Sequence, residues 1–427
     1  MRLKRWRWLS VLTVLLLILS SCLHQADRSN PNIIQVWAHA GPEGERQVIE
    51  QQIAQFNKSQ TDTTLEITFL PAGTYNAQVQ AAAISGDLPD VLEFDGPFVY
   101  NYVWQQNLIP IDDLLSPVVL EDLLPSIVNQ GTYSDRLYSV GTFDSGLGMY
   151  GDRRQLDAAG IRIPSSNADA WTAAEFQDAL VALARNDDDG QVLDLKLNYR
   201  GEWFTYGFSP ILQSAGDDLI NREDYQSATG ELNGEGAIAA MTQLQSWLED
   251  GYVDPNIDDA AFISRRVALS WVGHWTYPGY AEALGDDLVL LPLPDFGQGS
   301  KTGQGSWNWG ITANCEKPKV AIAFLEFILQ PDEVLAMTSA NGAVPGTKSA
   351  IAQSPLYVEG GPLSLFSAQL LTGKSVPRPQ TPAYPVITSV FQQAFNDIRH
   401  GTNVETALNK AAAEINQDIE DNQGYPS

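Results

Sequence analysis

Cysteine and histidine are scarce in this chain of 427 residues, which has two cysteines and four histidines. The histidines, His24, His39, His274 and His400, form no H-E-x-x-H motif and no pair at helical spacing. The sequence also lacks a G-x-S-x-G elbow, a Walker loop and a Rossmann glycine fingerprint. These absences remove the usual signatures of zinc enzymes, serine hydrolases and nucleotide-binding proteins. We therefore expect no metal site and no cofactor.

Basic residues are also few, because 25 Lys and Arg stand against 52 Asp and Glu, a formal net charge of −27. Four of them, Arg2, Lys4, Arg5 and Arg7, fall within the first seven positions, so the rest of the chain is more acidic still. Such a body would repel phosphate backbones and anionic lipids. We expect no nucleic-acid partner and no electrostatic adhesion to a membrane.

No apolar run is long enough to span a bilayer. The longest, Leu9–Leu19, is about half of the ~20 residues that a spanning helix needs. It follows basic residues and precedes Leu19-Ser20-Ser21-Cys22, so residues 1–22 predict an export signal. The last four residues resemble the lipobox of bacterial lipoproteins, which implies a diacylated Cys22 and an extracytoplasmic, lipid-anchored protein. The alternative is an ordinary signal peptide with an incidental cysteine. The polar residues 23–31 predict a tether.

Cys315 is the only other cysteine. It cannot form an internal disulfide once Cys22 is lipidated, so stability must come from core packing. Because Cys315 follows Ile311 and Ala313 at a predicted strand end, we interpret it as a small buried residue and not as a nucleophile.

The body of the chain alternates between strand and helix patterns. Strands are predicted over 33–38, 65–70 and 90–94, with helices between them, the second helix stopping at Gly86. This order implies a parallel sheet covered on both faces, an α/β fold. Further helices are predicted over Trp171–Ala184, with Thr172 and Glu175 as a capping box, and over Gly236–Glu249, Lys319–Leu329, Asp332–Ser339 and Val404–Ile419.

The acidic run Asp187-Asp188-Asp189 before Gly190 resembles the start of a calcium loop. Placing Gly190 at the sixth position of an EF-hand loop puts Arg185 at the first and Lys196 at the twelfth, where carboxylates are required. We therefore predict a solvated turn here.

Tryptophan is plentiful, and Trp271, Trp275, Trp307 and Trp309 gather in a segment rich in glycine. Rings among glycines and prolines suit a loop that lines a binding site better than the middle of a core helix. Flat aromatic faces stack on the apolar faces of sugar rings, while carboxylates, amides and arginine bind the hydroxyls. The segment therefore favours a site for a small polar ligand.

Six short segments, taken in order, resemble those of one protein family. They are Ile34–His39, Gly86–Asp95, Gly148–Gly160, Ala268–Trp275, Asn341–Pro345 and Arg378–Tyr384. Together they resemble the extracellular solute-binding proteins of bacterial ABC transporters, of the carbohydrate-binding kind that includes maltose, trehalose and multiple-sugar receptors. The resemblance covers residues 32–420. Two departures are Gly151, where the family usually has a second tyrosine, and His274, where proline is common.

The resemblance implies the two-lobe fold of periplasmic binding proteins, an α/β Venus-flytrap with hinge crossovers and a ligand cleft between the lobes. The first lobe would take 32–140 and 297–344, the second 141–296 and 345–420, and 421–427 would be a tail. It also implies that a monomer captures a sugar by closing its lobes and delivers it to the transmembrane subunits of an ABC permease, without enzyme activity.

The expected ligand contacts come from both lobes. Some are implied by matching positions in the family, and the others lie on predicted loops beside the matching segments. They are Glu43, Asp95, Asp144, Trp275, Tyr277, Trp307, Trp309 and Arg378. A solvated helix start is an equal interpretation of Glu43 and of Glu45. Packing in the lobe core is an equal interpretation of Trp203, Phe204 and Tyr206.

Two alternatives remain open from the sequence. One is the same fold with a different solute: a polyamine would suit aromatic rings with carboxylates, whereas a phosphoester would need more cations than Arg378. The other is a surface-anchored glycoside hydrolase that uses two of the many carboxylates.

Overall fold

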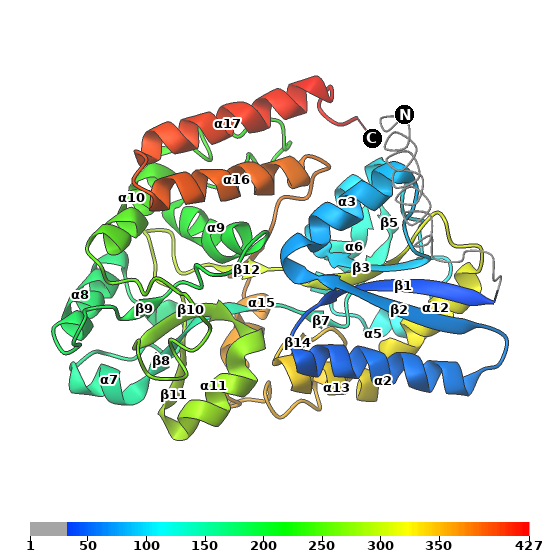
Figure 1. The fold of residues 1–427 in the computed structure, drawn as a ribbon, viewed down its shortest axis with the longest axis horizontal. Coiled ribbons are helices and arrows are strands. Elements are labelled where there is room, and N and C mark those ends of the chain that lie inside the picture. The colour runs from blue at the N-terminus through cyan, green and yellow to red at the C-terminus, as the bar shows by residue number, and fades with distance from the viewer. Residues whose placement is uncertain (1–31, 427) are drawn as a thin grey trace, which may run out of the picture.

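The computed structural model describes residues 32–426 and has two lobes, each built on its own β-sheet (Figure 1). The predicted α/β two-lobe fold is confirmed. The predicted signal, Cys22 and the tether lie outside the described residues. Among the residues that are described, no helix is both long and apolar enough to cross a bilayer.

The first lobe contains a five-stranded sheet in which a parallel part meets an antiparallel part. In order across the sheet, its strands are β2 (Thr64–Pro71), β1 (Ile33–Ala40), β3 (Val91–Asp95), β13 (Trp307–Ile311) and β6 (Ser139–Val140). β1 runs parallel to β2 and β3, whereas β13 runs antiparallel to β3 and β6. Trp307, which begins β13, therefore pairs with Asp95, which ends β3.

Helices cover both faces of this sheet. They are α2 (Glu43–Ser59), α3 (Tyr75–Ser85), α4 (Val99–Trp104), α5 (Pro117–Asp122), α6 (Pro125–Gly131), α12 (Pro318–Ile328) and α13 (Pro331–Asn341), and a short hairpin joins β4 (Thr132–Tyr133) to β5 (Arg136–Leu137). α2, one of the helices predicted between the strands, buries Ile49, Ile53 and Phe56, which recur at helical spacing. α3 ends at Gly86, whose φ of 76° fits a left-handed helix cap.

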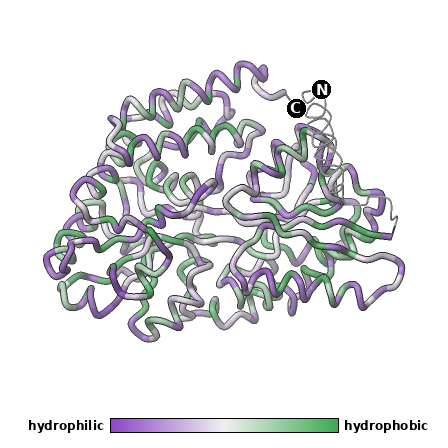
Figure 2. The backbone as a smooth tube through the Cα atoms, viewed as in Figure 1, coloured by the Kyte–Doolittle hydropathy of each residue, from purple (hydrophilic) through white to green (hydrophobic). Residues whose placement is uncertain are grey.

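The second lobe contains a four-stranded sheet. In order, its strands are β11 (Leu288–Leu291), β8 (Leu147–Asp152), β10 (Leu269–Gly273) and β9 (Leu193–Asp194). The helices around it are α7 (Arg153–Ala158), α8 (Ala173–Ala184), α9 (Trp203–Ala215), α10 (Glu235–Glu249), α11 (Tyr277–Leu284), α15 (Ser364–Leu371), α16 (Tyr384–Arg399) and α17 (Val404–Asp421). Figure 2 shows hydrophilic and hydrophobic residues alternating along α17, which covers the outside of α16.

The predicted capping box of α8 is confirmed. The backbone N–H of Glu175 donates to Thr172 Oγ1 at 3.2 Å, and the backbone N–H of Thr172 donates to Glu175 Oε2 at 2.9 Å. Two of the unpaired N–H groups at the helix start are thereby satisfied.

The chain passes between the lobes on three segments. It leaves the first lobe through β7 (Phe143–Asp144), returns through β12 (Thr302–Gln304), and leaves again through β14 (Val344–Pro345), which precedes the short helix α14 (Lys348–Ile351). β14 pairs antiparallel with β7, and β12 pairs parallel with β15 (Ser375–Pro377). We call β7, β12, β14 and β15 the crossover strands.

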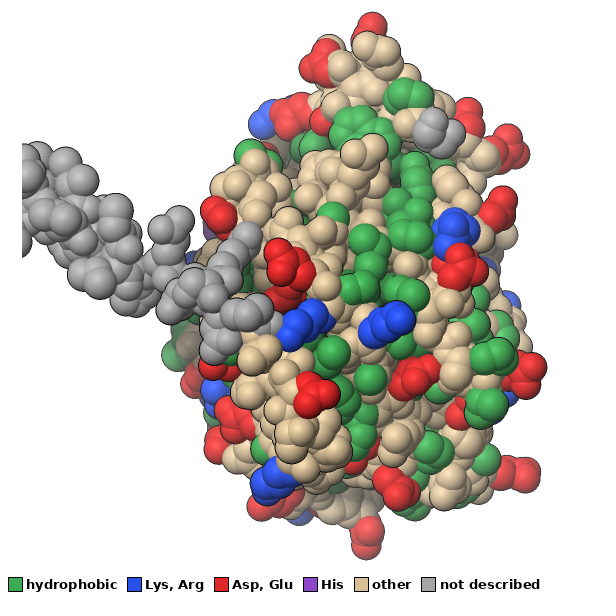
Figure 3. Space-filling view, turned by 90° about the vertical axis from the view of Figure 1, so that its right-hand side faces the viewer, with side chains coloured by type: hydrophobic (Ala, Val, Ile, Leu, Met, Phe, Trp, Pro, Cys, Tyr) green, Lys and Arg blue, Asp and Glu red, His purple; other side chains and the backbone are tan. Residues whose placement is uncertain are grey.

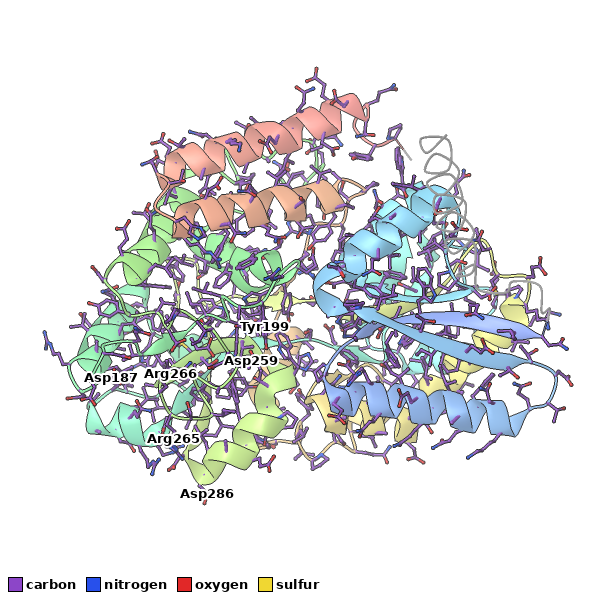
Figure 4. All side chains as sticks on the ribbon, viewed as in Figure 1. Asp187, Tyr199, Asp259, Arg265, Arg266 and Asp286 are labelled. Atoms are coloured by element: carbon purple, nitrogen blue, oxygen red, sulfur yellow. The ribbon has the colours of Figure 1, made fainter. Side chains whose placement is uncertain are left out.

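Two features predicted from the sequence, the acidic turn and Cys315, do not lie at the boundary between the lobes. Asp187 accepts hydrogen bonds from the backbone N–H groups of Asp189 and Gly190, so the acidic run is a turn, as expected. Figure 4 places Asp187 at the outer edge of the second lobe. Cys315 is half-buried just after β13, and burial raises the pKa of its thiol to about 11, which agrees with an unreactive side chain.

The acidic composition is visible on the surface. On the outer face of the first lobe that Figure 3 presents, acidic side chains are more frequent than basic ones and are scattered among polar and apolar groups. Among the described residues, no cluster of histidine, cysteine and carboxylate side chains is arranged to hold a metal ion.

Candidate functional site

Part of the candidate site lies where β1 and β3 end, the edge at which open α/β sheets bind ligands. We call His39, Glu45 and Trp307 the first half-site. His39 is near the end of β1, and its Nδ1 lies 2.8 Å from Glu93 Oε2. Its ring stacks on Trp307, with centroids 3.6 Å apart and planes 2° apart. Burial alone would lower the pKa of His39, but the charge and hydrogen bond of Glu93 raise it above its ordinary value. The half-site therefore holds a buried imidazole, hydrogen-bonded to a carboxylate, beside an aromatic ring.

Glu45 closes this half-site from the first turn of α2. It is 4% exposed, its Oε1 accepts a 3.2 Å hydrogen bond from Asn341 Nδ2, and its Oε2 lies 3.9 Å from His39 Nε2. Burial raises the pKa of Glu45. Glu43, two residues earlier, is exposed and accepts a hydrogen bond from Gln47 on the solvent side of the same helix. The helical turn thus directs Glu45 inward, so we leave Glu43 out of the proposed contacts.

Arg378 joins the two lobes beside the first half-site. The residue is 5% exposed. Its Nη1 donates to Asp95 Oδ2 at 2.9 Å and to Glu202 Oε2 at 2.8 Å, and its Nη2 donates to Asp95 Oδ1 at 2.5 Å. Asp95 belongs to the first lobe, Glu202 precedes α9 of the second, and Arg378 follows β15. Burial raises the pKa of Glu202, while the charge of Arg378 opposes that shift. These three residues form a buried ion triad.

The second half-site, which we define as Trp275 and Tyr277, is aromatic. Trp275 is half-buried in the 3₁₀ turn η5 (His274–Thr276) after β10; its ring meets that of Trp203 edge-on at 6.0 Å, and its Nε1 donates to Tyr199 Oη at 3.4 Å. A side chain at Gly273 would collide with the Trp275 ring, which lies over that glycine. Tyr277, also half-buried, begins α11. Figure 4 places Tyr199 on the side of the second lobe that faces the first.

Asn341 connects the two half-sites. It ends α13 of the first lobe, and its side chain holds Glu45, as described above. Its backbone oxygen lies 2.8 Å from Nδ1 of His274, the residue before Trp275. The Glu45 carboxylate of one lobe and the turn that carries Trp275 in the other are therefore tied to the same residue.

Two predicted contacts lie inside the protein. Trp309 is 3% exposed and packs edge-on against Phe324 in the core of the first lobe, because the sheet and α12 enclose that part of β13. We therefore leave Trp309 out of the proposed contacts. Asp144 is fully buried in β7, where it accepts hydrogen bonds from Gln130 Nε2 and from the backbone N–H of Ser145, and burial raises its pKa.

Sequence reasoning missed His39 and Glu93 and left Tyr206 undecided. The signal that could have found His39 is its place at the end of the first parallel strand, where ligands bind. Tyr206 lies beside the ion triad of Arg378, at what we call the junction between the lobes. Its hydroxyl donates to Ser145 Oγ at 2.8 Å, and its ring lies 5.0 Å from the guanidinium carbon of Arg378. Trp203 and Phe204 are buried in the cluster of the second-lobe core.

Comparisons with known proteins give a sequence relative, similar folds and a family match. A lipoprotein of Streptomyces antibioticus, described as uncharacterized and encoded in the oleD 5' region, is 21% identical over 93% of this chain and 91% of its own length. The maltose-bound MalE3 of T. maritima has a similar fold, with a TM-score of 0.77 and 19% identity over 90% of this chain and 98% of that one.

Another similar structure is the GacH receptor of Streptomyces glaucescens, solved unliganded and with acarbose, with a TM-score of 0.75 and 20% identity over 91% of this chain and 97% of that one. The sequence pattern of one family, described as bacterial extracellular solute-binding protein, matches residues 51–360. The match covers more than half of the chain, which therefore belongs to the family of bacterial extracellular solute-binding proteins.

Proposed function

We propose that the protein captures a sugar at the boundary between its lobes and delivers it to an ABC permease. The observation that carries this proposal is the link through Asn341, which ties Glu45 of the first half-site to the Trp275 turn of the second. A half-buried aromatic ring and a buried carboxylate suit a sugar, whose faces are apolar and whose rim carries hydroxyls.

The similar structures support the same class of ligand. By their descriptions, the T. maritima protein is bound to maltose, the Streptomyces glaucescens receptor to acarbose, and a maltotriose binding protein of Thermus thermophilus to maltotriose. The proposed contacts in this chain are Glu45, Trp275, Tyr277 and Trp307. Asp95 and Arg378 join them at the junction, because Arg378 Nε has no hydrogen-bond partner among the described residues.

Capture requires a difference in affinity between an open and a closed arrangement of the lobes. The lobes, which we propose to be 32–140 with 297–344 and 141–296 with 345–420, would rotate about the crossover strands. A sugar that contacts both half-sites at once binds the closed form more tightly and so shifts the population toward it. The closed form would then be the one that the permease recognises, and no bond is broken.

Delivery to a membrane permease requires the protein to stay near the membrane. Lipidation of Cys22 would provide that attachment, since two acyl chains hold a protein that its negative charge would otherwise push from an anionic surface. We propose an extracytoplasmic, lipid-anchored monomer.

The test is a thermal-shift screen of the mature lipoprotein in a detergent whose headgroup is not a sugar. The panel contains maltose, maltotriose, trehalose, sucrose, sorbitol and, as the non-sugar arm, spermidine. A bound ligand at 100 times its Kd adds about 2.7 kcal/mol to the free energy of unfolding and raises Tm. We expect at least one sugar to do this and to be recovered unhydrolysed.

The matched variants are Trp275→Ala and Trp104→Ala. Trp275→Ala should weaken sugar binding at least tenfold, because stacking on an aromatic face is lost. Trp104 ends α4, where its Nε1 donates to the Pro426 backbone oxygen and its ring packs edge-on against Tyr425, so its variant should bind normally. Stabilisation by spermidine alone would assign a polyamine instead, and cleavage of a sugar would assign a hydrolase. Equal binding by both variants would refute the placement of the site.

A further inference from the structure

His274 occupies a buried position between the lobes. It is 3% exposed and opens the turn η5, directly after β10 of the second lobe. Its ring lies edge-on to Phe143 of the crossover strand β7, at 5.9 Å, and to Trp275, at 5.3 Å. Proline is common here in proteins that the sequence resembles, so the imidazole is a feature of this chain.

The hydrogen bonds of His274 fix where its proton lies. Nδ1 is 2.8 Å from the backbone oxygen of Asn341, and a carbonyl oxygen can only accept, so Nδ1 carries the hydrogen. Burial lowers the pKa of His274 to about 4, so the ring is neutral at pH 7 and Nε2 is an acceptor. Ser145 Oγ, 3.1 Å from Nε2, therefore donates to it and accepts in turn from Tyr206 Oη.

The end of α13 is built to receive these donors. The last carbonyls of a helix have no partner within the helix, and here two of them accept hydrogen bonds from the second lobe. The Asn341 carbonyl accepts from His274, and the Gly342 carbonyl accepts from Tyr357 Oη at 2.5 Å. Gly342 adopts φ of 68°, and a side chain there would come within 2.7 Å of the His274 backbone oxygen. The two lobes therefore touch through backbone at this point.

The same asparagine holds Glu45, so the contact reaches the first half-site. A path of direct contacts runs from the Trp275 ring to His274, then to the Asn341 backbone oxygen, and through the Asn341 side chain to Glu45. Each end of this path is a proposed sugar contact. A change in the position of the His274 ring would therefore change the distance between the two half-sites.

We propose that His274 is a positioning residue that fixes the Trp275 ring relative to Glu45, by pinning the turn η5 to the end of α13. Its contribution to affinity rests on the proposed capture of a sugar. Its contribution to the position of Trp275 exists without any ligand. The two parts can therefore be measured separately.

The experiment compares His274→Phe with His274→Asn in the mature lipoprotein. Phenylalanine keeps a ring but donates nothing, whereas the Asn side-chain N–H can replace Nδ1 as donor to the Asn341 oxygen. With maltotriose, or whichever sugar of the panel binds, His274→Phe should bind about tenfold more weakly, the effect of one unpaired buried carbonyl. His274→Asn should recover to within about threefold. His400→Phe is the control, because His400 is exposed and its Nδ1 contacts only Asn396 of its own helix.

The ligand-free measurement uses 5-fluorotryptophan and ¹⁹F NMR, with the Trp275 signal assigned by its loss in Trp275→Phe. The signal should shift in His274→Phe, return toward its wild-type position in His274→Asn, and stay unchanged in the control. ¹⁵N NMR of the wild-type protein should show His274 neutral, with its proton on Nδ1, between pH 5 and 8.

Wild-type affinity together with an unshifted ¹⁹F signal in His274→Phe would overturn the proposal. Equal loss of affinity in both His274 variants would also overturn it, because the hydrogen bond would then not matter. If His274→Phe does not fold, the ¹⁵N spectrum decides: a proton on Nε2, or titration near neutral pH, overturns it. If no sugar binds, the proposed function fails while the ¹⁹F and ¹⁵N results still decide the role of His274.

Discussion

Replacing Arg378 by methionine would leave Asp95 and Glu202 buried side by side without their cation. Arg378 makes three charge-assisted hydrogen bonds to these carboxylates, which would sum to at least ~4.5 kcal/mol at ~1.5 each. Removing one partner of a buried ion pair costs about 3–5 kcal/mol. We therefore expect Arg378→Met to lower the free energy of unfolding by about 4 kcal/mol at pH 7, measured by guanidinium denaturation followed by tryptophan fluorescence.

The loss should depend on pH in a definite direction. Burial already raises the pKa of Glu202 in the intact triad, and removal of Arg378 raises it further. A carboxyl whose folded-state pKa exceeds its unfolded value of ~4.3 destabilises the fold increasingly as pH rises from that value through the folded-state pKa. The deficit of Arg378→Met should therefore be smaller at pH 5 than at pH 8.

A triple variant separates charge from packing. Combining Arg378→Met with Asp95→Asn and Glu202→Gln removes both carboxylate charges, so it should recover most of the lost stability. A deficit of Arg378→Met below about 1 kcal/mol, or one that is equal at pH 5 and pH 8, would refute the view that charge burial dominates at this junction.

Two further predictions address the site and the fold. Glu45→Gln should weaken sugar binding in a titration calorimeter at least fivefold, because a buried carboxylate accepts stronger hydrogen bonds from hydroxyls than an amide does, whereas exposed Glu43→Gln should bind as the wild type; equal effects of the two would contradict the inward placement of Glu45. Thr172→Ala removes the cap of α8 and should cost about 1 kcal/mol in chemical denaturation, with sugar affinity unchanged; an unchanged denaturation midpoint would show that the capping box contributes nothing.

Local signals in the sequence predicted the elements that local chemistry determines. The start of α8 was predictable because Thr172 and Glu175 satisfy backbone N–H groups three residues apart, and the end of α3 because Gly86 takes a left-handed conformation. α9 was not predicted. Almost all of its residues are buried and it contains Pro210, so it does not have the composition of a surface helix.

The sequence predicted those parts of the site that depend on residue type, but not those that depend on contacts between side chains far apart in the chain. The aromatic turn around Trp275 stood out because a ring among glycines suits a loop. The role of His39 could not be predicted from the residues next to it in the sequence. It depends on Glu93 in another strand and on Trp307, which is even further away along the chain. Glu43 and Glu45 are distinguished only by the phase of α2, which a search by residue type cannot supply.

The polar groups that join the half-sites lie on or beside the crossover strands. Ser145 follows β7, Arg378 follows β15, and Asn341 precedes the first residue of β14 by three positions. Each contacts residues of both lobes or of a lobe and a crossover strand, so the proposed rotation about those strands would change all three sets of contacts together. A sugar bridging Glu45 and Trp275 would therefore act on the hinge itself, and its affinity would include the free energy of rearranging these buried groups. Substitutions at the junction should then alter affinity even where they touch no ligand.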